Sequence, residues 1–302
     1  MDAAVRRDTA VRRRGGPDRA ADTVAHQVRV DAADVLTIGW LEAPPAGARL
    51  VLRHTASDGA SGTPSRTEHT VPLNGRPSCS VALGALGLAR GTWTVLLDAL
   101  GLTPAGPGGP GGSGADDPAR PLLTDDPGFS LDGLRAYADV RRERAIRVVR
   151  APGGQVALDV REVAPHAEVT AVRPAGGEIQ ISGRLAYTGP RPGPARLAAV
   201  ARKGGGATAR DLRIDGTEFE ACLPVDALAA APPALWDLWL EAAGVRARLA
   251  TLLDDAPGKR NKLSFPRQIA AGDGGTMSVR PYYTVEDALS VACHRVDERD
   301  AA

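Results

Sequence analysis

The stretch "VALGALGLARGTWTVLLDALG" (Val81–Gly101) decides the fold, because a second version of it, "LPVDALAAAPPALWDLWLEAAG" (Leu223–Gly244), occurs later in the chain. When the two are aligned, Trp93 falls on Trp236. Each tryptophan is followed by the apolar alternation that is typical of a half-buried β-strand. We therefore expect one indole per copy to fill the space between two sheets, in preference to an exposed platform on which a sugar would stack.

The repeat extends to both sides of this stretch. Upstream, "ADVLTIGWL" is echoed by "GEIQISGRL", with Gly39 placed opposite Gly183. Downstream, the copies close with "RVVRAPGGQVALDV" (from Arg147) and "SVRPYYTVEDALSV" (from Ser278). Because the blocks occur in the same order in both halves, the sequence predicts a duplicated domain.

The same alignment gives an expectation for the tyrosines near the end of the chain. Residues 151–154, Ala-Pro-Gly-Gly, take the place of Tyr282 and Tyr283. The stretch from Arg280 to Val291 is then predicted to be the end of a strand, a turn that contains Pro281, and a closing strand. The tyrosines are additions to that scaffold.

Short apolar runs, broken by Gly, Pro or Asp, dominate the rest of the sequence, and helical periodicity is nearly absent. The runs cover Val35–Leu41, Ala48–Thr55, Thr92–Leu100, Ile146–Ala151 and Val156–Val160. A chain of 302 residues is long enough for two cores. The sequence predicts an all-β protein of two tandem immunoglobulin-like antiparallel β-sandwich domains related by internal duplication.

The predicted boundaries follow composition. They are a disordered Arg-rich tail at 1–25, a first domain at 26–163 with a disordered Gly/Pro loop at 103–120, a second domain at 164–297, and a tail at 298–302.

Charge and hydropathy limit the classes of partner. Lys and Arg number 37 against 36 Asp and Glu, so specific nucleic-acid binding is not expected. No apolar run reaches the roughly 20 residues of a membrane span, and no secretory signal is visible, so we expect a cytoplasmic location. The three cysteines, Cys79, Cys222 and Cys293, lack metal or disulfide spacing and are expected to be buried free thiols.

Motifs of catalysis are missing from the sequence. The five histidines lack metal-ligand spacing, and "GPGGPGGSG" lacks the lysine and the helix of a phosphate-binding loop. No cofactor, metal ligand or catalytic residue is predicted. Two acidic pairs, Asp125-Asp126 and Asp254-Asp255, occupy corresponding places in the copies. Turn formation is the favoured interpretation, and a divalent cation or acid–base site is the alternative.

One basic cluster stands near the tyrosines in chain order. A solvated loop is the favoured interpretation of "GKRNK" (Gly258–Lys262), and the alternative is that it holds a phosphate-bearing polymer or a lipid head group beside the aromatic rings. The predicted ligand-binding residues are Arg280, Tyr282, Tyr283, Lys259, Arg260 and Lys262.

The last block also resembles a known ending. Arg280–Thr284 followed by Leu289–Val291 is similar to the close of the tandem immunoglobulin-like accessory regions of actinobacterial wall-polymer glycosyltransferases and of teichoic-acid-type CDP-glycerol glycerophosphotransferases. Those regions also carry W-x-L-x-L strands, represented here by Trp236–Leu240. Where they have Gly-Asn before the leucine, this chain has Asp287-Ala288, and no catalytic domain is visible.

The resemblance implies a non-catalytic accessory or interaction module in cell-envelope polymer synthesis. Its partner would be a glycosyltransferase or polymer synthase, or its ligand a glycan or wall polymer. One alternative is a transferase for a sugar or glycerol-phosphate substrate, with a site between the domains that uses Asp254 and Asp255. A further alternative is a structural protein that forms a homo-oligomer.

Overall fold

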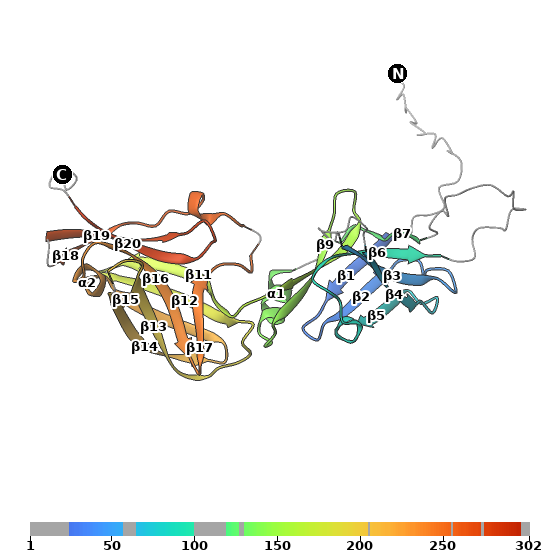
Figure 1. Ribbon diagram of the computed structural model, residues 1–302, viewed down its shortest axis with the longest axis horizontal. Coiled ribbons are helices and arrows are strands. Elements are labelled where there is room, and N and C mark those ends of the chain that lie inside the picture. The colour runs from blue at the N-terminus through green and yellow to red at the C-terminus, as the bar shows by residue number, and fades with distance from the viewer. Residues whose placement is uncertain are drawn as a thin grey trace, which may run out of the picture.

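The computed structural model consists of two groups of β-strands that follow one another along the long axis of the molecule (Figure 1). It describes residues 24–56, 65–99, 119–126, 130–204, 206–254, 256–272 and 275–296. Its α-helices within these ranges are short, α1 (Leu131–Ala138) and α2 (Val225–Ala229). The prediction of an all-β protein is confirmed. None of the described helices has the length and apolarity needed to cross a membrane.

The N-terminal group forms two sheets, with strand orders β5-β2-β1-β8 and β4-β3-β6-β10-β9, and β7 adds to β6. Its strands are β1 (Val24–Val30), β2 (Val35–Trp40), β3 (Arg49–Ala56), β4 (Ser65–Pro72), β5 (Ser78–Ala82), β6 (Gly91–Asp98), β7 (Ala119–Pro121), β8 (Leu123–Thr124), β9 (Arg144–Arg150) and β10 (Val156–Glu162). A 3-10 helix, η1 (Leu83–Leu86), precedes β6.

The C-terminal group repeats this order as β15-β12-β11-β17 and β14-β13-β16-β20-β19, with β18 added at the end. Its strands are β11 (His166–Ala175), β12 (Glu178–Ala186), β13 (Gly193–Ala201), β14 (Ala207–Asp215), β15 (Glu218–Pro224), β16 (Ala234–Ala242), β17 (Val245–Ala250), β18 (Gln268–Gly272), β19 (Gly275–Tyr283) and β20 (Leu289–Arg295). A 3-10 helix, η2 (Lys259–Asn261), lies between β17 and β18.

The two groups differ in how their sheets join. In the C-terminal group, β14 pairs with β15 and β16 pairs with β17, so seven strands from β11 to β17 close into a ring through the β13–β16 pairing. In the N-terminal group the corresponding strands form two separate sheets. The same order of strands therefore occurs twice, with one continuous ring and one pair of sheets.

Each group has its own apolar core, and the two tryptophans singled out above lie in these cores. Trp93 (0% exposed) and Trp236 (1%) are among the largest fully buried side chains. In both groups the indole is paired across the sheet with an apolar residue of the closing strand, Leu158 in β10 and Val291 in β20. The prediction that they fill the core is confirmed.

The predicted alignment of Gly39 with Gly183 was wrong by one residue. Both β1–β2 and β11–β12 contain a bulge, and beyond it Val28 pairs with Ile38 and Val172 with Ile181. Ile38 therefore corresponds to Ile181, and both are fully buried. A slip of one residue reverses the face of every side chain, so burial selects this register over the matching glycines.

The alignment of the tyrosines was also wrong. The turn of the β9–β10 hairpin is closed by Ala151 N–H donating to Gln155 O (2.8 Å), and that of β19–β20 by Thr284 N–H donating to Ala288 O (2.9 Å). Ala151 thus corresponds to Thr284, and the tyrosines correspond to Val149 and Arg150. Pro281 lies within β19 rather than in the turn.

The structure also tests the predicted domain boundaries and the predicted burial of the cysteines. Val24 and Ala25, placed in the predicted tail, already belong to β1, and Ala119 and Arg120, placed in the Gly/Pro loop, form part of β7. Most of both segments, and the tail at 298–302, lie outside the described residues. Of the three free thiols, Cys293 is buried as predicted, whereas Cys79 and Cys222 are partly exposed.

Candidate functional site

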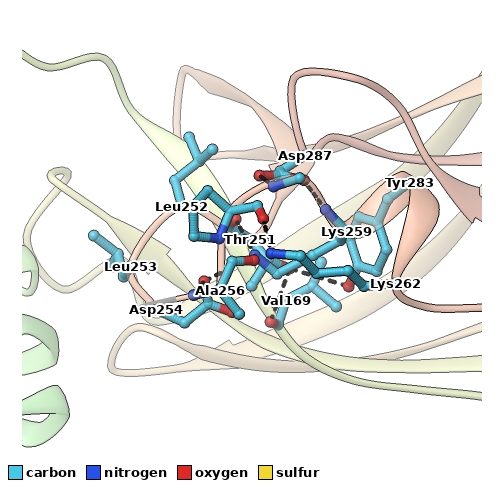
Figure 2. A network of polar contacts seen from close by, with 12 residues as sticks. Val169, Thr251, Leu252, Leu253, Asp254, Ala256, Lys259, Lys262, Tyr283 and Asp287 are labelled. Carbon is cyan, nitrogen blue, oxygen red and sulfur yellow. Dashed lines mark hydrogen bonds and ion pairs between the residues drawn. The ribbon is translucent and has the colours of Figure 1, made fainter.

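Lys259 belonged to the predicted binding set, and the structure places it inside the protein (Figure 2). It is only 3% exposed. Its Nζ donates to Thr251 O (3.1 Å), Ala256 O (2.9 Å) and Asp254 Oδ1 (2.8 Å). A buried ammonium with three acceptors is fully engaged. Lys259 therefore holds the 251–262 loop together and has no donor left for a ligand.

Tyr283 is likewise part of the interior. It is 5% exposed, and its phenolic oxygen accepts a hydrogen bond from the Thr251 hydroxyl at 3.0 Å. Burial raises the pKa of Tyr283, and the nearby carboxylate of Glu168 raises it further. The ring packs 5.9 Å from that of Phe265. Tyr283 thus joins the loop to the closing hairpin.

Asp287 completes this network. Its carboxylate accepts the backbone N–H groups of Gly258 (2.8 Å) and Lys259 (2.7 Å). Burial opposes ionisation, but these two donors and the Lys259 charge outweigh it, so the pKa of Asp287 lies below its ordinary value. At the position where the resembling regions carry Gly-Asn, this chain therefore uses an aspartate to fix its basic loop.

A buried acid–histidine pair fixes the start of the same loop. Glu168 accepts backbone N–H groups from Leu252 (2.8 Å) and Leu253 (3.0 Å), and His166 Nε2 lies 3.0 Å from its Oε2. Both side chains are nearly inaccessible. These contacts set the position of Asp254, which comes next in the chain.

The other predicted binding residues are exposed or partly exposed. Arg280, Arg260 and Lys262 are exposed, and Arg280 hydrogen-bonds Ser264. Tyr282 points to the opposite face of β19 from Tyr283, and its buried hydroxyl lacks a hydrogen-bond partner among the described residues. The predicted set is thus divided between the core and the surface.

A different site is present where the strand groups meet. A cleft of about 750 Å³ is bounded by β1, β2, α1, β9 and β10 of the N-terminal group and by Asp254 of the C-terminal group. Its charged lining consists of four arginines and two aspartates, Arg29, Arg147, Arg150, Arg161, Asp31 and Asp254. Arg29 and Arg161 are each paired with a carboxylate just outside the lining, Asp126 and Asp159, so Arg147 and Arg150 are the arginines left to favour an anionic ligand.

The arginines of the cleft are only partly engaged. Arg147 Nη2 donates to Tyr187 Oη (3.2 Å), but its buried Nε has no hydrogen-bond partner among the described residues. Arg161 pairs with Asp159 at 3.2 Å on the surface. Arg150 is exposed and makes no ion pair within the part of the chain that the structure describes. Free guanidinium donors suit carboxylate or phosphate oxygens.

The helix α1 forms one wall of the cleft and is rigidly attached. The Tyr137 hydroxyl donates to Asp34 Oδ1 and accepts the backbone N–H of Ile146 (2.9 Å), while the Arg142 guanidinium lies 3.6 Å above the ring centroid. Burial, followed by the hydrogen bond to Asp34, raises the pKa of Tyr137. The wall is therefore held by contacts on both of its sides.

Sequence reasoning missed this cleft for an identifiable reason. In a chain whose basic residues are almost all arginine, single arginines carry little signal. The available signal was the occurrence of Arg147 and Arg150 in one predicted strand, Ile146–Ala151. The structure adds Arg29, which is far away in sequence.

Of the acidic pairs, Asp254 has the predicted turn role, whereas Asp126 binds the backbone of β1. Asp126 is 8% exposed and accepts the Val28 N–H at 3.0 Å, and Asp254 accepts the Ala256 N–H (3.2 Å) and pairs with Lys259. Asp255 lies outside the described residues. Within the described ranges, no three His, Cys, Asp or Glu side chains come together as a metal site would require.

Comparisons with known proteins give remote likenesses only. No family model and no curated protein matches the sequence. A crystal structure of S. aureus TarS is 13% identical over 54% of this chain and 30% of that one, with a TM-score of 0.38; a TarS fragment is 12% identical over 56% and 53%, with the same score. A two-domain fibronectin type-III segment of chicken tenascin is 10% identical over 75% and 93%, with a TM-score of 0.19. This chain spans about a third to a half of the TarS chains, and similarity at this level carries no conclusion about its activity.

Proposed function

We propose that this chain is a non-catalytic accessory module of cell-envelope polymer synthesis, and that it docks a protein partner, a glycosyltransferase or polymer synthase, in the arginine-lined cleft. The observation that carries the proposal is the cleft itself, with its four arginines against two aspartates. The resemblance of Arg280–Val291 to accessory regions of wall-polymer enzymes supports the choice of partner. Junctions between domains are common docking sites.

The proposal also covers the fold and the boundaries of each strand group. We infer that each strand group is an immunoglobulin-like sandwich domain, with boundaries near 26–163 and 164–297, and that the two arose by duplication. The matching strand orders and the parallel pairings β1–β8 and β11–β17 support this inference.

A photo-crosslinking experiment in the protein's own host tests the docking function. A photoreactive phenylalanine replaces Val149, which lines the cleft and is 42% exposed, and in a control chain it replaces Ile269, which is 55% exposed on β18. We expect a wall-polymer transferase or synthase to be crosslinked from Val149, to be absent from Ile269, and to be lost when Arg150→Glu is added. The same products from both positions, or none from Val149, would overturn the proposal.

A second candidate function is the transferase with a site between the strand groups. Asp254 does line the cleft together with arginines, as that hypothesis requires. However, its Oδ1 already accepts from Lys259 and Ala256. If Asp254→Asn abolishes turnover of a sugar or glycerol-phosphate donor while the melting temperature is unchanged, the transferase is favoured. Destabilisation alone favours the structural role.

A further inference from the structure

One edge of the N-terminal group is open where the cleft lies. Within the described ranges, β9 is the last strand of its sheet and pairs with β10 alone. Successive N–H groups of an antiparallel strand point to opposite edges. Because Ile146 N–H donates to Tyr137 rather than to β10, the N–H groups of Val148 and Arg150 also point to the outer edge. No described group outside the strand pairs with either of them.

The corresponding edge of the C-terminal group is covered by β18 as far as Val279. β18 pairs with β19, and Gln268 faces Val279 at the position that corresponds to Ile146. Pro281 stands at the position of Val148, since Val148 pairs with Leu158 and Pro281 with Val291. Proline has no N–H to offer, and it is a common means of protecting an edge strand. The chain thus protects this edge in one group and leaves it open in the other.

The open edge borders the arginines of the cleft. Five consecutive residues, Ile146–Arg150, line the hollow, and Val149 is exposed between two of its arginines. Charged side chains on an edge strand often serve only to discourage pairing with another strand. Here they surround a cavity, and a buried guanidinium nitrogen of Arg147 has no partner among the described residues. That arrangement suits a ligand that brings both a peptide backbone and negative charge.

We propose that the cleft binds an extended acidic segment of the partner protein, which adds to β9 as a further strand. The proposal rests on the docking function above and specifies the chemistry of the partner. The segment's carbonyl groups accept the Val148 and Arg150 N–H groups, and its alternate side chains are carboxylates on the face of the sheet that carries Arg150. A phosphate polymer would use the arginines but not the strand edge, and the test separates the two.

Fluorescence anisotropy of the purified full-length chain with a labelled peptide of alternating Glu and Val residues tests the proposal. Val148→Pro copies the protected edge of the other group, and we expect it to weaken binding about tenfold or more, because peptide hydrogen bonds are lost. Arg150→Gln should also weaken binding and reduce its dependence on salt. Arg173→Gln, an exposed arginine of β11 outside the cleft, serves as the matched control and should leave binding unchanged.

Two further ligands distinguish binding to the backbone edge of β9 from binding to the charged side chains of the cleft. A peptide of the same sequence with alternate backbone nitrogens methylated, and polyphosphate, should both bind at least about tenfold more weakly than the unmodified peptide. If Val148→Pro binds normally, or if polyphosphate or the methylated peptide binds as tightly, strand addition is excluded. The methylated peptide uses the wild-type chain, so the test stands even if Val148→Pro fails to fold.

The outcome is separable from that of the crosslinking experiment. A transferase crosslinked from Val149 without any binding of the acidic peptide would leave the docking function standing and overturn strand addition. Peptide binding that needs the β9 edge, without a wall-polymer enzyme among the crosslinked products, would support strand addition and overturn the docking function.

Discussion

The turns of the two closing hairpins, β9–β10 and β19–β20, make the same backbone hydrogen bonds with different residues. In each, the fourth residue of the turn has a positive φ, 84° for Gly154 and 55° for Asp287. In each, the carbonyl of that residue accepts a backbone N–H from a threonine, Thr124 or Thr251. These backbone hydrogen bonds are therefore kept, while the third residue differs, since Gly153 also has a positive φ (84°) and Glu286 does not.

The difference lies in what stabilises the positive φ. Glycine adopts it without steric cost, whereas a residue with a Cβ pays for it. Asp287 offsets that cost through the N–H groups of Gly258 and Lys259, which its carboxylate accepts. The C-terminal turn is thereby tied to its basic loop, whereas the N-terminal turn carries no carboxylate that could make such a tie. A strained aspartate here indicates a structural role.

The largest expected effect concerns the two cores. Trp93→Ala and Trp236→Ala should each lower the free energy of unfolding by about 3–5 kcal/mol, because each leaves a cavity in its own core. Chemical denaturation followed by circular dichroism measures the loss. Trp239→Ala is the control, since this partly exposed indole lies against Arg246 on the surface and should cost clearly less. Equal losses for all three would contradict the assignment of the cores.

The second-largest expected effect concerns the buried lysine of the C-terminal group. Lys259→Met should cost about 3 kcal/mol, because it leaves the carboxylate of Asp254 and two carbonyl groups without their donor. Lys262→Met, three residues further on and exposed, should change the free energy by less than about 0.5 kcal/mol. Thermal unfolding of both variants provides the measurement. If the two substitutions cost the same, Lys259 is a surface residue and the predicted basic site regains its support.

A smaller difference is expected between the two core tryptophans. Trp93 Nε1 donates to Ala89 O at 2.9 Å, whereas Trp236 Nε1 has no partner among the described residues. Trp93→Phe should therefore cost about 1 kcal/mol more than Trp236→Phe, since only the first leaves a carbonyl unpaired. Urea denaturation of the pair resolves this difference. The opposite ranking would show that Trp236 has a partner in solution.

The smallest effect concerns acid. The pKa of Asp287 is lower in the folded chain than the unfolded value of about 3.9, so its ionised form stabilises the fold above that pH. The contribution is lost as the pH falls through the folded pKa. Asp287→Asn should therefore lower the melting temperature at pH 6 and make little difference near pH 2. Asp211→Asn, at an exposed position, should show no such convergence.

The sequence predicted the repeated, all-β architecture because strands and turns leave a local signature. Alternation around Trp93 and Trp236 placed both indoles in cores, as found. The detailed registers failed for physical reasons. The loop between β1 and β2 is one residue longer than the loop between β11 and β12, as the pairs Val30–Leu36 and Pro174–Ile179 show, so matching Gly39 with Gly183 gave the wrong register.

The candidate site was largely beyond sequence reasoning. From the sequence alone, Lys259 cannot be told apart from a solvent-exposed lysine. Only the folded loop places its ammonium group against Thr251 and Asp254. The cleft needs Arg29 from the first strand beside Arg147 and Arg150, a proximity that only the three-dimensional fold creates. The open edge of β9 could be recognised only by comparison with the proline in the other group.

Amide hydrogen exchange of the full chain, read residue by residue by NMR, tests the docking cleft most directly. In the free protein the amides of Val148 and Arg150 should exchange quickly, and that of Val149, which points to β10, slowly. Adding the acidic peptide should protect Val148 and Arg150 selectively. If both amides are already protected in the free chain, or remain unprotected when the peptide is bound, the edge of β9 does not receive a strand.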